Sequence, residues 1–288
     1  MEDKRIKVLL SGATGFIGSF IAEELIKYNY ELLLTKRENS SMENCKSFIN
    51  KVKWVNLDNE TFIEEAVGFS PNIIIHSAWI GVRAEDRDDE ILQRENITLF
   101  DKFLLIASLS PICKFISMGS QAEYGYLNSV VSETQQPNPL NAYARVKLMV
   151  LDKLKEFCLE RNILWYWLRI FPIKGKRESA SWLLSALEKN INNPNCFEMN
   201  FTSAEQKYAY LDVETMANYV LRIVQKRQGK SGIYNISASN AIALKEIIIK
   251  IRDEKRPSFK LNFGVLPTRE NQSLIIEGSM DKFNKEFL

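Results

Sequence analysis

The first 172 residues alternate between short apolar runs and amphipathic helical patterns, and this alternation limits the fold more than any other feature. The apolar runs have the length of strands, and the segments between them repeat apolar residues at helical spacing. Strand-like runs fall at 6–11, 30–35, 52–57, 72–77, 113–118 and 163–170, and helical patterns fall at about 17–28, 60–68, 91–109 and 141–160. The alternation predicts a doubly wound α/β fold with helices on both faces of a parallel Rossmann sheet.

The alternation loosens after residue 172, where loop-like segments separate shorter patterns. We therefore expect a dinucleotide-binding domain at 1–172 and a smaller C-terminal α/β lobe at 173–288 that binds substrate. We also expect the 212–236 portion of that lobe to return to the main sheet.

Composition excludes several classes of function. Of the 288 residues, 45% are hydrophobic and 26% are charged, and the net charge of +2 gives no electrostatic basis for a nucleic acid or a membrane as partner. The four cysteines are scattered without CxxC spacing, as in reduced cytosolic proteins. His76 is the only histidine, which excludes a His-based catalytic triad and a multi-histidine metal site.

The N-terminal region carries no targeting signal that we recognise. An apolar strand-like run begins within six residues of Met1, which leaves no room for a signal peptide, and no apolar run approaches the ~20 residues of a membrane span. We expect a cytoplasmic protein without a bound metal.

Three glycines stand between the first predicted strand and the first predicted helix. Gly12 permits a tight turn, Gly15 lets backbone approach a pyrophosphate, and Gly18 lets the helix pack closely on the sheet. The spacing of three and three differs from the common two and three, and an ordinary αβ turn is the alternative. Strand, glycine turn and helix in this order favour a dinucleotide site, because the helix N-terminus offers N–H groups to phosphates.

Tyr143 and Lys147 are four residues apart on a predicted helix and therefore lie on one face of it. An ammonium group near a phenol lowers the phenol's pKa toward the working range of an acid or base. The spacing alone is also that of an ordinary surface pair. Ser120 stands in the polar turn after the strand-like run at 113–118, and its hydroxyl can donate to the same substrate oxygen, although a simple turn former is the alternative.

The second predicted strand ends in two cations, Lys36 and Arg37. NAD-specific sites place an acidic residue here to bind the ribose 2′-hydroxyl, whereas cations suit the 2′-phosphate of NADP. A solvated basic turn is the alternative. We expect NADPH as the cofactor, with NAD less favoured.

Together these motifs resemble the extended short-chain dehydrogenases/reductases of the nucleotide-sugar epimerase/dehydratase family. Gly12-Ala-Thr-Gly-Phe-Ile-Gly18 is similar to the family's cofactor motif, and Tyr143-Ala-Arg-Val-Lys147 is similar to its catalytic motif. Ser120 stands four residues before Tyr124-Gly125, where the family places its catalytic Ser or Thr. The resemblance spans nearly the whole chain, but the Gln-Arg-Asp-Phe segment usual in the family is reduced here to Gln206-Lys-Tyr-Ala.

The resemblance implies further contacts. Beyond the three glycines and the two cations, the implied cofactor-binding residues are Thr14, Phe16, Ile17, Asn56, Leu57, Ser77, Ala78, Trp79, Asn96, Lys147 and Phe171. We expect Arg83, Gln121 and Arg269 to contact a nucleotide-diphosphate sugar, with Arg269 gripping the diphosphate. Relatives pair the helices near 91–109 and 141–160, so we also expect a homodimer.

Branches of the family differ in the acid–base groups that they add. A 4,6-dehydratase needs Asp and Glu directly after its catalytic Thr, where this chain has Gln121 and Ala122. A 3,5-epimerase/reductase needs a Cys and His pair, and the only histidine lies in the cofactor-side strand. What remains is a 4-ketoreductase or a 4-epimerase.

The basic turn favours an NADPH-dependent reduction of a 4-keto, deoxy nucleotide sugar for surface polysaccharide biosynthesis. The turn Ser-Gln-Ala-Glu-Tyr-Gly most resembles 4-ketoreductases of the CDP-abequose/CDP-paratose synthase type. An NAD-dependent nucleotide-sugar 4-epimerase is the alternative. A non-catalytic NADP(H)-binding regulator is the alternative of another class, although such regulators typically lack the Tyr/Lys pair.

Overall fold

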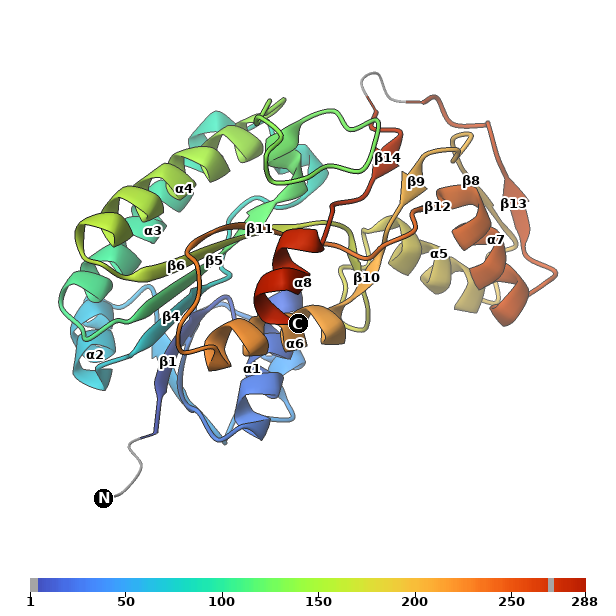
Figure 1. The fold of residues 1–288 in the computed structure, drawn as a ribbon. Coiled ribbons are helices and arrows are strands. Elements are labelled where there is room, and N and C mark those ends of the chain that lie inside the picture. The colour runs from blue at the N-terminus through green and yellow to red at the C-terminus, as the bar shows by residue number, and fades with distance from the viewer. Residues whose placement is uncertain (1–4, 269–271) are drawn as a thin grey trace.

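A parallel sheet of seven strands forms the centre of the molecule (Figure 1). The computed structural model describes residues 5–268 and 272–288, and the strand order within them is β11-β6-β5-β4-β1-β2-β3. These strands are β1 (Lys7–Ser11), β2 (Glu31–Lys36), β3 (Lys53–Asn56), β4 (Ile73–His76), β5 (Lys114–Ser120), β6 (Leu164–Ile170) and β11 (Gly232–Ile236). The predicted doubly wound α/β fold is confirmed.

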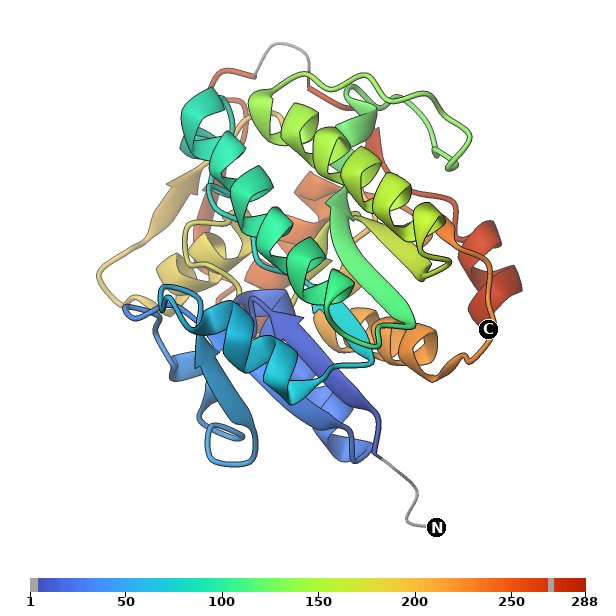
Figure 2. The ribbon, with the colours of Figure 1, turned by 90° about the vertical axis from the view of Figure 1, so that its left-hand side faces the viewer.

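Helices cover both faces of this sheet, and alternate strand residues supply the two cores. Val8 and Leu10 pack in the cluster that includes the helices of one face, whereas Leu9 packs in the cluster of the other face, because successive strand side chains point in opposite directions. One face carries α1 (Phe16–Lys27), α6 (Val213–Gln225) and α8 (Asp281–Phe287), and the other carries α2 (Phe62–Phe69), α3 (Glu90–Ser108) and α4 (Ala142–Glu160). Figure 2 shows α3 and α4 side by side over the sheet.

The edge strand β11 comes from late in the chain. It pairs in parallel with β6, from Gly232 opposite Tyr166 to Ile236 opposite Ile170. The preceding helix α6 is tied to the sheet by the buried Lys114, whose Nζ donates to three carbonyls at the C-terminal end of that helix. Carbonyls at a helix C-terminus have no partner within the helix, so a cation there satisfies them.

A smaller lobe lies beside the carboxyl ends of the strands (Figure 1). Its own core joins Leu187, Phe201, Ile248 and Phe259. The lobe contains α5 (Leu183–Asn192), α7 (Leu244–Lys255), β8 (Glu198–Asn200), β9 (Lys207–Tyr208), β12 (Ile242–Ala243), β13 (Lys260–Asn262) and β14 (Ile275–Ile276). The short pair β7 (Ile173–Lys174) and β10 (Leu211–Asp212) connects it to the main sheet.

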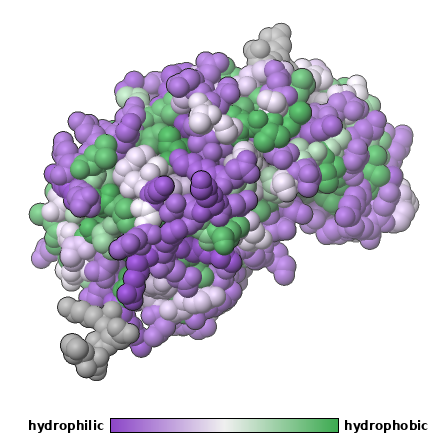
Figure 3. All heavy atoms as spheres, in the orientation of Figure 1, coloured by the Kyte–Doolittle hydropathy of each residue, from purple (hydrophilic) through white to green (hydrophobic). Residues whose placement is uncertain are grey.

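The surface is mixed in character. On the face shown in Figure 3, hydrophilic side chains cover most of the area and hydrophobic ones form separate patches. None of the helices in the described part of the chain combines the length and the apolar character that crossing a membrane requires.

Candidate active site

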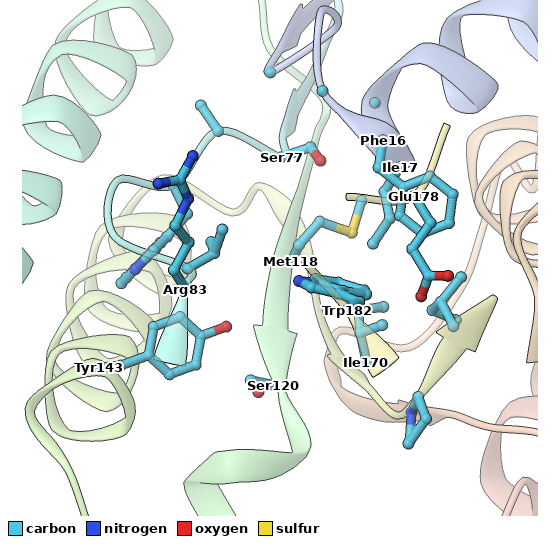
Figure 4. A pocket seen from close by; sticks show the side chains of 18 of the residues that line it. Phe16, Ile17, Ser77, Arg83, Met118, Ser120, Tyr143, Ile170, Glu178 and Trp182 are labelled. Atoms are coloured by element: carbon cyan, nitrogen blue, oxygen red, sulfur yellow. The ribbon is translucent and has the colours of Figure 1, made fainter. Parts of the chain in front are cut away.

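A cavity of about 770 Å³ opens at the carboxyl ends of the parallel strands, between the main sheet and the smaller lobe. Ligands bind at this edge of doubly wound sheets, where the connections leave a crevice. Figure 4 shows β5 running through the site, with Tyr143 and Arg83 on one side and Phe16, Glu178 and Trp182 on the other. The cavity is therefore built by both parts of the molecule.

Two glycines of the segment that joins β1 to α1 have no room for a side chain. Gly12 has a φ of +73°, and a Cβ there would lie 2.7 Å from the Ala78 nitrogen. A Cβ on Gly18 would lie 2.1 Å from the Gly12 oxygen, so the helix meets the turn backbone to backbone. Helix α1 begins at Phe16, and its N-cap residue, Gly15, supplies no side-chain hydrogen bond. Its first N–H groups face a cavity lined by this turn, which fits a dinucleotide pyrophosphate.

The end of β2 contributes the polar edge of the same cavity. Thr35 is buried, and its Oγ1 has no hydrogen-bond partner among residues 5–268 and 272–288. Lys36, Arg37 and Ser40 follow it along the cavity wall. Among the residues that the structure describes, neither Lys36 nor Arg37 forms an ion pair. An orphaned hydroxyl beside two uncommitted cations fits a ribose and an adjoining phosphate.

The structure brings Ser120, Tyr143 and Lys147 together. Ser120 is the last residue of β5, and Tyr143 lies in the first turn of α4, which Asn141 caps by accepting the N–H of Ala144. The hydroxyls of Ser120 and Tyr143 share a hydrogen bond, and both side chains line the cavity. All three residues are at most 9% exposed. A hydroxyl and a phenol at one point can serve a single substrate oxygen.

Lys147 is held by neighbours other than the tyrosine. Its Nζ donates to the Met118 carbonyl at 2.6 Å and lies 3.5 Å from the centre of the Trp79 ring. Burial lowers the pKa of Lys147 well below its ordinary value, and the Glu123 carboxylate opposes that shift. Trp79 is itself fixed by donating its indole N–H to Gln93.

The expected lowering of the Tyr143 pKa by Lys147 is wrong for this structure. Burial raises the pKa of Tyr143 above its ordinary value, and Glu123 adds to the rise. The groups that lower it are the charge of Arg87 and the hydrogen bond from Ser120. The reason is desolvation, which disfavours a buried phenolate more than the neighbouring groups favour it.

A buried ion pair stands behind Ser120. Glu123, in the 3₁₀ helix η3 (Gln121–Tyr124), accepts from Arg169 Nε at 2.7 Å and from the Trp167 indole. It also accepts from the Ser120 N–H at 2.7 Å, while Ser120 Oγ accepts from Ala122 N at 3.1 Å. This capping box fixes both the backbone and the side chain of Ser120. Burial raises the pKa of Glu123, and Arg169 counteracts that rise.

His76 is neutral and belongs to the support of the glycine turn. Burial lowers its pKa to about 3. Its Nδ1 lies 3.0 Å from Ser11 Oγ, which already accepts the N–H groups of Ser77 and Ala78. The Ser11 hydroxyl therefore donates to Nδ1, and the ring carries its proton on Nε2. We infer that His76 orders the segment at 77–79 and does not react.

The side of the cavity that faces the smaller lobe is more open. Glu178 lines it with a pKa raised by burial, and its carboxylate accepts from Ser185. Trp182 contacts Phe16 edge to face, with ring centres 6.1 Å apart. We call Ser120, Tyr143 and Lys147, together with the Glu123–Arg169 ion pair behind them, the buried wall. The open wall consists of Lys36 and Arg37 at the end of β2 and of Glu178 and Trp182 on the lobe side.

Most residues predicted for the site line this one cavity. They are Gly12, Thr14, Gly15, Phe16, Ile17, Gly18, Lys36, Arg37, Leu57, Ser77, Ala78, Trp79, Arg83, Ser120, Gln121, Tyr143, Lys147 and Phe171. Asn56 and Asn96 are not among its described lining residues. Asn56 Oδ1 accepts from Asp58 N, and the buried Asn96 bonds both backbone groups of Ile80, which shapes the loop after β4. Arg269 lies outside the described residues.

The sequence interpretation missed Arg87, Glu123, Glu178 and Trp182. Arg87 belongs to none of the motifs identified in the sequence, yet its guanidinium carbon lies 5.1 Å from the centre of the Tyr143 ring. For Glu123 a signal existed, because Arg169 interrupts an apolar strand and a buried arginine requires a partner. No group of His, Cys, Asp and Glu within the described residues has the arrangement of a metal site.

Comparison with known proteins points to one family. The model of the "NAD dependent epimerase/dehydratase family" matches residues 8–237. CDP-abequose synthase of Salmonella muenchen is 24% identical over 282 residues, which cover 94% of this chain and 88% of that protein. The dTDP-6-deoxy-L-talose 4-dehydrogenase (NAD(+)) of Aggregatibacter actinomycetemcomitans is 21% identical, over 95% of this chain and all of that one.

Solved structures share the fold over nearly the whole chain. UDP-glucuronic acid 4-epimerase from Bacillus cereus, in complex with UDP-glucuronic acid and NAD, has a TM-score of 0.86 at 20% identity and covers 98% of this chain and 93% of its own. UDP-glucose 4-epimerase of Thermus thermophilus, in complex with NAD, has a TM-score of 0.83 at 19% identity over 97% and 92%. At this identity the likeness establishes the fold.

Proposed function

Because the chain belongs to the NAD dependent epimerase/dehydratase family, we propose that it reduces the 4-keto group of a deoxy nucleotide sugar with NADPH. The family uses a nicotinamide cofactor, and the names of the relatives concern nucleotide-linked sugars. The observation that carries the proposal is the convergence of Ser120, Tyr143 and Lys147 on a cavity that also contains the glycine turn.

The residues present fit the cofactor. The N–H groups at the start of α1 would hold the pyrophosphate, and Thr35, Lys36 and Arg37 would hold the ribose and its 2′-phosphate. When bound, a nicotinamide supplies or accepts a hydride. Lys147 and Phe171, which the family resemblance assigns to cofactor binding, both line the cavity.

The chain's own residues supply the proton and the hydrogen bond that a carbonyl reduction needs. Ser120 Oγ accepts from Ala122 N, and its hydroxyl hydrogen, which it shares with Tyr143 in this structure, would donate to the substrate oxygen when a substrate binds. Tyr143, whose raised pKa keeps the phenol protonated at neutral pH, would donate the proton to that oxygen. Glu123 is bound by three donors and buried, so it is not available for the elimination of water that a dehydratase performs.

An NAD-dependent 4-epimerase is the second candidate. The two solved structures described above both contain NAD, and both are 4-epimerases of UDP-sugars. Against it stands the basic end of β2, where an NAD site has a carboxylate. The two reactions differ in net cofactor consumption: a reductase consumes one NADPH per product, whereas an epimerase recycles its cofactor.

The test is to incubate the purified protein with NADPH or NADH and a panel of 4-keto nucleotide sugars, and to follow absorbance and product. We expect NADPH oxidation at one equivalent per product, and a loss of about 10³-fold in Tyr143→Phe with NADPH binding retained. Interconversion of 4-epimers with no net cofactor consumption would replace the proposal with the epimerase. NADPH binding without turnover of any sugar would favour the non-catalytic regulator.

The homodimer also stays a proposal. Ile91, Leu105 and Met149 are exposed apolar side chains on α3 and α4, the pair of helices on which we expect a second copy to dock. A role in surface polysaccharide biosynthesis and a cytoplasmic location are part of the same proposal.

A further inference from the structure

Arg87 places a second cation at the predicted catalytic phenol. It follows the 3₁₀ helix η2 (Ala84–Asp86) in the loop between β4 and α3, and its guanidinium carbon lies 5.1 Å from the centre of the Tyr143 ring. Its Nε donates to the Val82 carbonyl at 3.1 Å, which holds the half-buried side chain in place. Arg87 lines the same cavity as Ser120 and Tyr143.

Lys147, the other cation near the phenol, is also engaged with further partners. Its Nζ lies 5.7 Å from the centre of the Tyr143 ring, is committed to the Met118 carbonyl and sits over Trp79. Burial lowers the pKa of this ammonium and raises that of the phenol. A guanidinium keeps its charge throughout the accessible pH range.

Within the described part of the chain, the other groups in contact with the Tyr143 side chain are uncharged or negative. From β5 comes the Ser120 hydroxyl, and from η3 comes the Glu123 carboxylate, which disfavours a second negative charge. From the segment after β4 comes the Trp79 ring, which meets the phenol edge to face at 5.8 Å. Arg83 lies on the same side of the site but is exposed (Figure 4).

We propose that Arg87 is a positioning residue that acts through Tyr143: its guanidinium stabilises the phenolate left when the tyrosine gives its proton to the substrate oxygen. The inference rests on the proposed function only in taking Tyr143 as the acid or base. In the reduction, hydride and proton add across the carbonyl, and the phenolate regains its proton from solvent. In the reverse direction the phenolate takes the proton from the sugar hydroxyl.

The side chain can be changed without removing the backbone contact that Arg87 makes. The Arg87 carbonyl accepts the Tyr143 N–H at 2.9 Å, and this bond does not depend on the side chain. Arg87→Gln therefore removes the charge and Arg87→Lys retains one. Arg145→Gln is the matched control. Arg145 lies on α4 with Tyr143, but it is exposed and pairs with Glu90.

The titration of Tyr143 is the direct test. In protein labelled with ¹³C at the tyrosine Cζ, the Tyr143 resonance is identified by its loss in Tyr143→Phe, and its chemical shift is followed with pH. We expect Arg87→Gln to raise the pKa of Tyr143 by about one unit, Arg87→Lys to raise it less, and Arg145→Gln to leave it in place. The inference would be overturned if Tyr143 had the same pKa in Arg87→Gln as in wild type. It would also be overturned if Arg145→Gln shifted that pKa as much as Arg87→Gln does.

Kinetics add a readout that a structural role would not move. In the pH–rate profile, the apparent pKa that reports Tyr143 should rise in Arg87→Gln by the same amount as in the NMR titration. In the reverse direction, in which the phenolate takes the proton from the sugar hydroxyl, activity at neutral pH should fall about tenfold. An equal loss at every pH would contradict the proposal. If no nucleotide sugar is turned over, the proposed function fails while the NMR titration still decides the role of Arg87.

Discussion

The two walls of the cavity differ in what holds their side chains. On the buried wall, Glu123 and Arg169 are at most 1% exposed and every donor around the Glu123 carboxylate comes from β5 or β6. On the open wall, Arg37 is exposed and Glu178 and Trp182 are half-buried. Groups on the buried wall are fixed before any ligand arrives, which is what acid–base chemistry requires. Groups on the open wall remain free to adapt to a ligand, so their substitution should change affinity more than stability.

Breaking the buried ion pair should have the largest effect. Glu123→Gln leaves the Arg169 guanidinium without a counter-charge in the interior, and we expect the free energy of unfolding to fall by about 3–5 kcal/mol. Urea denaturation followed by circular dichroism measures it. The matched change on the open wall, Glu178→Gln, should cost much less, because burial disfavours that carboxylate.

A double variant separates the charge from the packing at the same place. Glu123→Leu with Arg169→Met replaces the pair by apolar groups and should recover most of the lost stability, although Ser120 would lose its capping box. Equal stability of Glu123→Gln and Glu178→Gln would remove the distinction between the walls.

At the end of β2, Arg37→Glu should weaken NADPH binding by about tenfold or more and change NADH binding much less, because a charge-assisted contact to the 2′-phosphate is lost. Fluorescence titration with each cofactor measures both constants. Lys51→Glu makes the same charge change at an exposed position away from the cavity and is the control. Parallel losses for the two cofactors would refute a 2′-phosphate site.

On the lobe side, Trp182→Ala should have the smallest effect. Loss of one aromatic contact surface is expected to raise the KM for the nucleotide sugar by about fivefold to tenfold with little change in kcat. Steady-state kinetics at saturating NADPH measure the two constants. Phe197→Ala removes an exposed aromatic ring of the same lobe outside the cavity and serves as the comparison. A fall in kcat with unchanged KM would show that Trp182 acts in the chemical step, like the residues of the buried wall, and not in substrate affinity.

The observed elements show how much of the fold follows from local pattern. The predicted runs at 6–11, 72–77 and 163–170 correspond to β1, β4 and β6 to within a few residues, because apolar periodicity and glycine turns act over a few residues of chain. The same locality explains why Gly12, Ser120 and Tyr143 were found. Each carries a motif whose meaning depends on the adjoining strand or helix, and the carboxyl ends of parallel strands necessarily share one edge.

By itself, then, the sequence determined the Rossmann sheet, the glycine turn and the residue types that meet at its edge. Only the tertiary structure decided which charge each of them faces. Arg87 and Tyr143 are separated by 56 positions in the chain, and Glu123 and Arg169 by 46. Such contacts leave no periodic trace in the sequence. Desolvation is likewise a property of the packed molecule, and it turned the Tyr143 pKa upward where spacing alone had predicted a fall.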